Sequence, residues 1–247
     1  MDERWSLAGR GQLGVIAGVT LQTRRRPWRM TGRILRWSSL SDHVTDRAAL
    51  AGYDFVRARV RVGARGEQVT AHVGGTPREP PPHVVDATPP ESIDLYALLM
   101  RERSEASDLA CPALELVLPL PCDRAWRELA DLIVSAGVPA HQPEGHAVMI
   151  VERDPRFPLA PIPTPSGVML ALRPKLPPAD ARALVPALQA IGRRAIELGA
   201  RIYLMSIELD DPDSIDRQLG AAAPRWRALK TLHDPRALLN PGLLTNR

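Results

Sequence analysis

Apolar and polar residues alternate most regularly between residues 54 and 73. In "DFVRARVRV" (54–62) small and branched apolar residues alternate with three arginines, as in a strand that buries one face and exposes the other. The segment "EQVTAHV" (67–73) shows the same period beyond the "GARG" turn. The two segments therefore predict an antiparallel hairpin. The patterns at 15–22 and 30–37 predict two further strands.

The second half of the chain alternates between strand-like and helix-like patterns. The helix at 122–137 is expected to begin at an Asp123 cap and to end at Gly137. The expected elements, in chain order, are a strand at 113–120, the helix at 122–137, strands at 146–152 and 167–174, a helix at 178–199 and a strand at 200–206. This β-α-β-β-α-β order is typical of the ferredoxin-like split βαβ arrangement. We predict an α+β fold with an antiparallel sheet, helices on one face, and extra strands from the hairpin.

The remaining segments connect these units. A short helix is expected to start at a Ser41 or Asp42 cap and to end near Gly52. The Pro-rich stretch 76–90 predicts an extended connector. The segment 90–106 predicts a helix with an acidic first turn, and two short helices are expected near the C-terminus.

Composition limits the function classes. The 247 residues are 45% apolar and 24% charged, with a net charge of +4, which is typical of a globular protein and low for a nucleic-acid-binding one. No apolar run approaches the ~20 residues that span a bilayer, and no secretory signal pattern occurs. The sequence therefore predicts a cytoplasmic protein. Cys111 and Cys122 lack metal-binding spacing, so we expect ordinary buried thiols and no metal site.

The stretch "AGRGQLGVIAG" (8–18) has the G-x-G-x-x-G spacing of nicotinamide-binding turns. Such turns follow a buried strand, open a helix, and precede an acidic residue that binds the ribose. Here the preceding residues are polar, a strand pattern follows, and no acidic residue occurs between Val15 and Ser41. The sequence therefore argues against a nicotinamide site.

The longer string "AGRGQLGVIAGVTLQTRRRP" resembles the glycine-rich segment of FAD-linked oxidases of the vanillyl-alcohol oxidase type, in the form seen in cytokinin dehydrogenases. The chain departs from that pattern at Ala8, Leu13 and Ala17. The closing segment "RWRALKTLHDPRALLNPGLL" resembles the end of the same family, and looser similarity runs between the two. The resemblance implies that FAD is contacted by Gly9, Gly11, Gln12, Gly14, Val15, Ile16, Asn240, Pro241 and Gly242.

The resemblance also implies that this chain corresponds to the C-terminal half of such an enzyme. Residues 1–37 would be the last strands of the FAD-binding domain, 38–232 the substrate cap and 233–247 a tail returning to the FAD domain. FAD binding would then require a separate N-terminal FAD-binding polypeptide. The completed enzyme would oxidise a C–N or C–OH bond of a small-molecule substrate. The resemblance nominates no catalytic residue.

Two alternatives stay open. The chain could be a non-enzymatic, ligand-binding remnant of such an enzyme. It could also bind nucleic acid through six arginines between residues 24 and 36, which are interleaved with Trp28 and Trp37, because arginine and aromatic side chains grip phosphates and stack on bases. We weigh the arginine stretch mainly as a solvated strand edge.

Overall fold

The described residues form one nine-stranded sheet. A computed structural model describes residues 29–64, 66–76, 78–100, 108–140, 145–153, 162, 164–203, 209, 212–236 and 238. The strands are β1 (Arg29–Trp37), β2 (Phe55–Gly63), β3 (Gly66–Gly74), β4 (Asp86–Ala87), β5 (Glu91–Asp94), β6 (Leu114–Pro119), β7 (His146–Glu152), β8 (Ser166–Leu172) and β9 (Arg201–Ile202). Their order is β4-β1-β3-β2-β7-β8-β6-β9, and β5 pairs with the first half of β1.

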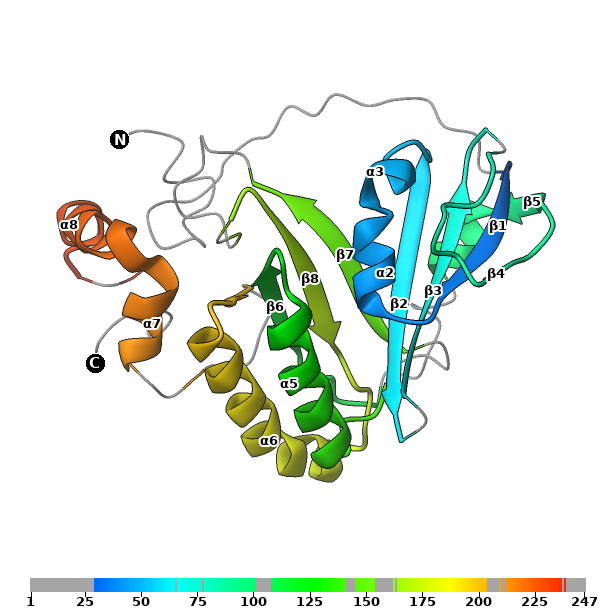
Figure 1. The fold of residues 1–247 in the computed structure, drawn as a ribbon. Coiled ribbons are helices and arrows are strands. Elements are labelled where there is room, and N and C mark those ends of the chain that lie inside the picture. Colours follow the sequence, from blue (N-terminus) through cyan, green and yellow to red (C-terminus); the bar gives the residue numbers. More distant parts are fainter. Residues whose placement is uncertain are drawn as a thin grey trace.

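Helices lie mainly on one side of this sheet (Figure 1). They are α2 (Leu40–Thr45), α3 (Arg47–Leu50), α4 (Leu95–Met100), α5 (Asp123–Ser135), α6 (Pro178–Glu197), α7 (Pro212–Leu219) and α8 (Ala223–His233), with a 3-10 turn at Gly220–Ala222. The amphipathic helices α5 and α6 pack side by side in front of the sheet. No helix in the described part of the chain is long and apolar enough to cross a membrane.

The predicted α+β class is confirmed. The elements β6-α5-β7-β8-α6-β9 follow the β-α-β-β-α-β order, and the strands lie in the order β7-β8-β6-β9. Strand β8 therefore separates β6 from β7, which is the split βαβ arrangement. All strand pairings are antiparallel.

The predicted hairpin is also confirmed and extends the sheet. Strands β2 and β3 pair in register from Phe55–Gly74 to Gly63–Gly66. The far edge of β3 pairs with β1, so residues 29–37 belong to the same sheet as the hairpin. The division of the chain into parts ending at residues 37 and 232 stays a prediction.

The hairpin joins the split βαβ unit through a short ladder between β2 and β7. This ladder runs only from Ala58–Val148 to Val60–His146. Gly145 precedes β7 with a φ of +122°, and a Cβ at this position would lie 2.1 Å from the carbonyl oxygen of Val60. Only glycine allows the two backbones to approach this closely in this conformation.

One face of the sheet builds the core. Because side chains alternate along each strand, one row across seven strands consists of buried apolar residues: Leu35, Ala71, Ala58, Val148, Leu170, Leu116 and Ile202. Helix α5 adds Leu129 and Ile133 to this cluster, and α6 adds Leu188 and Ile191. The helical period of these residues explains why both helices were predictable.

The structure corrects several local predictions. Helix α2 is capped by Ser39, whose hydroxyl accepts the Asp42 N–H, and not by Ser41 or Asp42. Residue Asp123 is the first residue of α5, and Cys122 precedes it without a side-chain capping bond. The start of the predicted helix at 90–106 is instead strand β5, because pairing with β1 satisfies its backbone. These cases show contacts made elsewhere in the chain overriding local preference.

The two cysteines differ, contrary to the prediction that both are buried. Cys122 is buried, and burial raises the pKa of its thiol to about 11. Cys111 is exposed, although partial burial of its thiol still raises the pKa. Both thiols are therefore protonated and weakly nucleophilic near neutral pH.

Polar contacts attach α7 to the sheet edge and stabilise the end of α8. Gln218 in α7 accepts the backbone N–H of Ile202 in β9 at 3.0 Å, in a buried position. In α8, buried Lys230 forms a 2.5 Å ion pair with Asp234. The Asp234 carboxylate also accepts the Leu238 N–H at 2.8 Å, so it ends the helix and orients the chain that follows.

Glu67 in β3 connects three elements. One carboxylate oxygen accepts the Leu40 N–H at the start of α2 at 2.9 Å, and the other accepts the indole N–H of Trp126 in α5. Because α2 and α5 both cover the core face, this side chain fixes the hairpin against the helix layer. A charged acceptor with two fixed donors stabilises more than a neutral one.

We expect Glu67→Ala to lower the free energy of unfolding by about 2–3 kcal/mol, because it leaves two donors without their acceptor. Urea denaturation measures this loss. The exposed Glu79→Ala is the matched control, and we expect it to change stability by less than about 0.5 kcal/mol. Equal stability of the two variants would contradict the role assigned to Glu67.

Candidate functional site

The face of the sheet opposite α5 and α6 differs chemically from the core face. Two rows of paired residues lie on it, one on each side of the β2–β7 ladder: Ile34, His72 and Arg57 in β1, β3 and β2, and Met149, Met169, Val117 and Arg201 in β7, β8, β6 and β9. We call the face that carries these rows the second face. Its centre is apolar and both of its sides carry arginines.

The apolar centre is open to solvent at β7. The Met149 side chain is 55% exposed, and its cross-strand neighbour Met169 is half-buried. Val117 and Ala171 flank Met169 and are buried, yet they lie outside the main core cluster. Flexible thioether side chains of this kind adapt to apolar and aromatic surfaces.

Three arginines of β2 line one side of the centre. Arg57 Nη1 donates to the Leu98 carbonyl of α4 at 2.7 Å, which shows that α4 lies on this side of the sheet. Arg59 is 7% exposed and donates to the Gly145 carbonyl at 3.3 Å, and Arg61 donates to the Gln68 amide oxygen at 2.8 Å. Carbonyl and amide oxygens thus help to orient these three guanidinium groups.

The opposite side holds an ion pair between a buried carboxylate and a half-exposed arginine. The carboxylate of Glu115 in β6 is fully buried and accepts hydrogen bonds from Nε and Nη2 of Arg173. The backbone N–H of Tyr203 donates to the Glu115 carbonyl at 2.7 Å. The second face therefore combines apolar contact area, fixed positive charge and one neutralised carboxylate.

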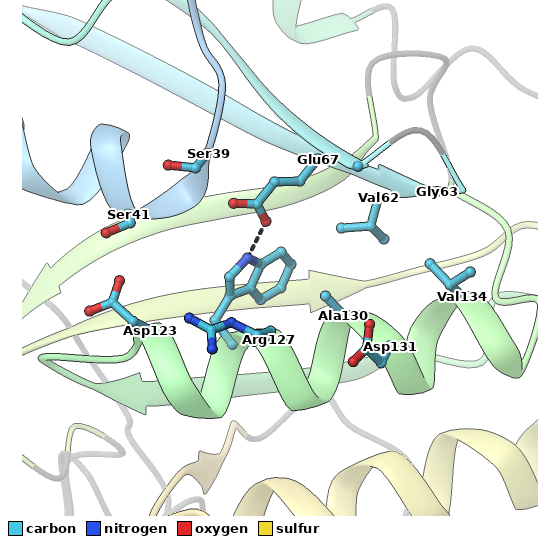
Figure 2. Close-up of a pocket in the computed structure, with 12 residues that line it drawn as sticks. Ser39, Ser41, Val62, Gly63, Glu67, Asp123, Arg127, Ala130, Asp131 and Val134 are labelled. Carbon is cyan, nitrogen blue, oxygen red and sulfur yellow. Dashed lines mark hydrogen bonds between the residues drawn. The ribbon is translucent and has the colours of Figure 1, made fainter.

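A cleft of about 460 Å³ lies on the helix side of the sheet (Figure 2). Helix α5 forms one wall, and the end of the β2–β3 hairpin and the start of α2 form the other. Its central carboxylate, Glu67, is directed at the Trp126 indole and carries the two structural bonds described above. The remaining charged groups, Asp123, Arg127 and Asp131, lie along α5. The cleft thus marks the joint between hairpin and helices.

A second polar cluster surrounds the buried Asp46. Its carboxylate accepts hydrogen bonds from the Trp37 indole N–H at 2.7 Å and from the His83 backbone N–H at 3.2 Å. It also lies 2.7 Å from Nδ1 of the His83 ring. This carboxylate raises the pKa of the His83 imidazole. The cluster ties the Pro-rich connector to the first helices.

Two other histidines are buried as neutral groups. His43 packs edge-on against Trp37 with ring centroids 4.7 Å apart, and burial lowers its pKa to about 4. His146 at the start of β7 is 3% exposed, and burial, with a smaller effect of Arg59, lowers its pKa to about 4. The Nδ1 atoms of both rings have no hydrogen-bond partner among the described residues.

The structure does not test the residues assigned to FAD. Gly9, Gly11, Gln12, Gly14, Val15, Ile16, Asn240, Pro241 and Gly242 lie outside the described residues. Arg29, Arg33 and Arg36 of the arginine stretch lie on β1, where Arg36 pairs with Asp86. Trp37 is fully buried, so it is a core residue and is not available to stack on bases. Among the described residues no cluster of three potential metal ligands occurs.

The second face was missed at the level of sequence. The alternation at 54–62 identified Arg57, Arg59 and Arg61 as one side of a strand, and we expected that side to be solvated. The same period in 146–152 distinguishes Met149 from the core residues beside it. The feature that could have predicted this face is the occurrence of arginine and methionine at the non-core positions of strands that lie side by side in the sheet.

Comparison with known proteins finds similarity in structure but none in sequence. Neither a protein-family model nor a curated protein matches the chain. Among solved structures, 6-hydroxy-D-nicotine oxidase from Arthrobacter nicotinovorans aligns with 85% of this chain and 53% of its own, at 14% sequence identity and a TM-score of 0.44. The chain thus spans about half the length of that oxidase.

The buried His146 predicts acid sensitivity. Its folded pKa of about 4 lies below its ordinary value of 6.5, so the unfolded chain binds the proton first and stability falls as the pH drops from 6.5 to 4. The full loss is about 3 kcal/mol. We expect His146→Leu to reduce the slope of unfolding free energy against pH in this range, measured by urea denaturation. The core control Val148→Ala should lower stability while keeping the wild-type slope.

The Asp46–His83 pair predicts the opposite dependence. Because the folded pKa of His83 is raised, its stabilisation is present below pH 6.5 and disappears as the pH rises through the folded value. We expect His83→Gln to remove this alkaline loss of stability. Thermal melting at several pH values measures the effect. The double variant Asp46→Asn/His83→Gln should show no further change in slope. A wild-type slope in His83→Gln would contradict this assignment.

Proposed function

We propose that the chain forms the C-terminal, substrate-covering part of an FAD-dependent oxidoreductase related to cytokinin dehydrogenases. Completed by an N-terminal FAD-binding half, it would oxidise a C–N or C–OH bond of a small molecule. The proposal joins the resemblance of residues 8–27 and 225–244 to that family with the form of the sheet between them.

The observation that carries the proposal is the chemical difference between the two faces of the sheet. The core face is sealed by α5 and α6, whereas the second face presents exposed Met149 beside half-buried Met169 and the arginines of β2. Ligand sites combine apolar contact area with a few oriented polar groups. A face of this kind is suited to cover a substrate that is held from the other side by a second body.

The described residues fit the substrate side of such a site. The arginines of the second face are held by carbonyl and amide oxygens, and its centre is apolar, so it supplies orientation and excludes water. The contacts to the cofactor would come from residues 9–16 and 240–242, where absent side chains let the backbone approach a flat ring. Bound FAD would supply the acceptor for the electrons removed from the substrate.

We expect flavin to associate with the chain when the N-terminal half is present. The chain should be co-expressed with the polypeptide encoded immediately upstream, and the visible spectrum of the purified sample recorded. Oxidised-flavin absorbance is the expected result. Gly14→Val should weaken flavin binding by about tenfold or more, because the added side chain blocks backbone approach.

The matched control is Gly63→Ala, where an added Cβ meets no atom within 4 Å, and it should bind flavin like the wild type. A colourless sample that also leaves flavin fluorescence unchanged on titration would overturn the proposal. Ligand binding by such a colourless sample would instead favour the non-enzymatic alternative.

A further inference from the structure

One face of α5 lines the cleft on the helix side of the sheet (Figure 2). The residues that it contributes recur at helical spacing and are Asp123, Trp126, Arg127, Ala130, Asp131 and Val134. At a rise of about 1.5 Å per residue, they extend for about 16 Å along the helix axis. The cleft volume of about 460 Å³ lies within the range of about 300–1,000 Å³ that is usual for small-molecule sites. The cleft is therefore large enough to hold a ligand.

The middle of the cleft offers apolar contact area. Val62 of β2 points from the hairpin toward the part of α5 that carries Ala130 and Val134 (Figure 2). The Val134 side chain is 43% exposed, so apolar surface is open to solvent at this end. A ligand with a short apolar body would cover this surface, and removing it from water would stabilise the complex.

The charge of the cleft is opposite in sign to that of the chain. The chain has a net charge of +4. Three carboxylates and one guanidinium group line the cleft and give it a net charge of −2: Glu67, Asp123, Asp131 and Arg127. A concave site lined mainly by one sign of charge attracts ligands of the other sign. The cleft therefore favours a cation.

The charged groups of the cleft are available to a ligand. Asp123, Arg127 and Asp131 are exposed, and none of them forms a side-chain hydrogen bond or ion pair with another described residue. Glu67 is half-buried and accepts the two hydrogen bonds from Leu40 and Trp126. A carboxylate has about four lone-pair sites, so Glu67 can accept further hydrogen bonds from a ligand.

The spacing of the carboxylates favours an organic cation over a metal ion. Asp123 and Asp131 lie two turns apart on α5, which separates their backbones by about 12 Å. Their carboxylates therefore cannot both bind one ion, and no group of three potential metal ligands occurs in the described ranges. An elongated molecule, in contrast, can lie along the cleft between them.

We propose that the cleft binds a small primary amine, with its ammonium group at Glu67 and its apolar body between Val62 and Ala130. An ammonium group has three N–H donors, and hydrogen bonds between ionised groups are stronger than those between neutral ones. Asp123 and Asp131 add attraction from the two ends of the cleft. The site lies on the helix side of the sheet, so it is separate from the second face and from the proposed flavin chemistry.

The test uses the full chain labelled with 5-fluorotryptophan and 2-phenylethylamine as the probe. We expect titration to shift the ¹⁹F resonance of Trp126, which lines the cleft and is assigned by Trp126→Phe. Trp226 in α8 is the internal reference, because α8 lies away from the cleft (Figure 1). The neutral analogue 2-phenylethanol should bind about tenfold or more weakly.

Substitutions of the charged residues test the sign of the site. The double variant Asp123→Asn/Asp131→Asn should weaken binding of 2-phenylethylamine by about tenfold, because two exposed attractions are lost. Arg127→Gln should tighten binding by about threefold, because the only positive charge among the lining residues is removed. The matched control is Asp180→Asn at the exposed start of α6, and it should bind like the wild type.

A larger side chain in the cleft tests the position of the apolar body. Ala130→Leu should weaken binding of 2-phenylethylamine by about tenfold or more, because the added carbons occupy the space between Ala130 and Val62. An unchanged Trp226 resonance and melting temperature verify that each variant is folded.

An unchanged Trp126 resonance on titration, or equal binding of the amine and the alcohol, would overturn the inference. Wild-type binding by Ala130→Leu and by the double variant would also overturn it. Weaker binding by Arg127→Gln would contradict it as well, since the arginine would then hold the ligand. The titration needs neither flavin nor an N-terminal half, so its result is independent of the proposed function.

Discussion

The carboxylate of Glu67 is the constraint on which the arrangement of the sheet depends. It accepts hydrogen bonds from Leu40 at the start of α2 and from Trp126 in α5, two helices that lie far apart in the sequence. Strand pairing joins the hairpin to the split βαβ unit through the short β2–β7 ladder. Fixing β3 against the helix layer helps to keep the strands of both units in one continuous sheet. The second face depends on this continuity, because it is formed by residues of neighbouring strands.

The two faces are coupled because neighbouring residues of one strand belong to opposite faces. Val60 is fully buried in the core, and Arg59 beside it bonds the Gly145 carbonyl on the other side. A shift of β2 by one residue would place arginines in the core. The hydrophobic core thus sets the positions of the charged groups, because packing on one face fixes which residues of β2 lie on the other.

Regular periodicity explains what the sequence could predict. The residues of β2, β3, β7 and α5 follow a clear period of two or 3.6, and the structure has these elements at nearly the predicted positions. The prediction failed at "ESID", where an acidic first turn suggested a helix but the free edge of β1 took the segment as a strand. It also could not place Arg201 in one row with Met149 and Met169, because that row depends on the strand order β7-β8-β6-β9.

The narrow ladder between β2 and β7 is the place where two parts of one sheet meet. On one side lie β1 to β5, and on the other the split βαβ unit with its own helices. Gly145 lies beside this ladder, where a Cβ would collide with the Val60 carbonyl. The continuity of the sheet therefore depends on a position that carries no side chain, and the size of the residue there limits how closely the two parts can approach.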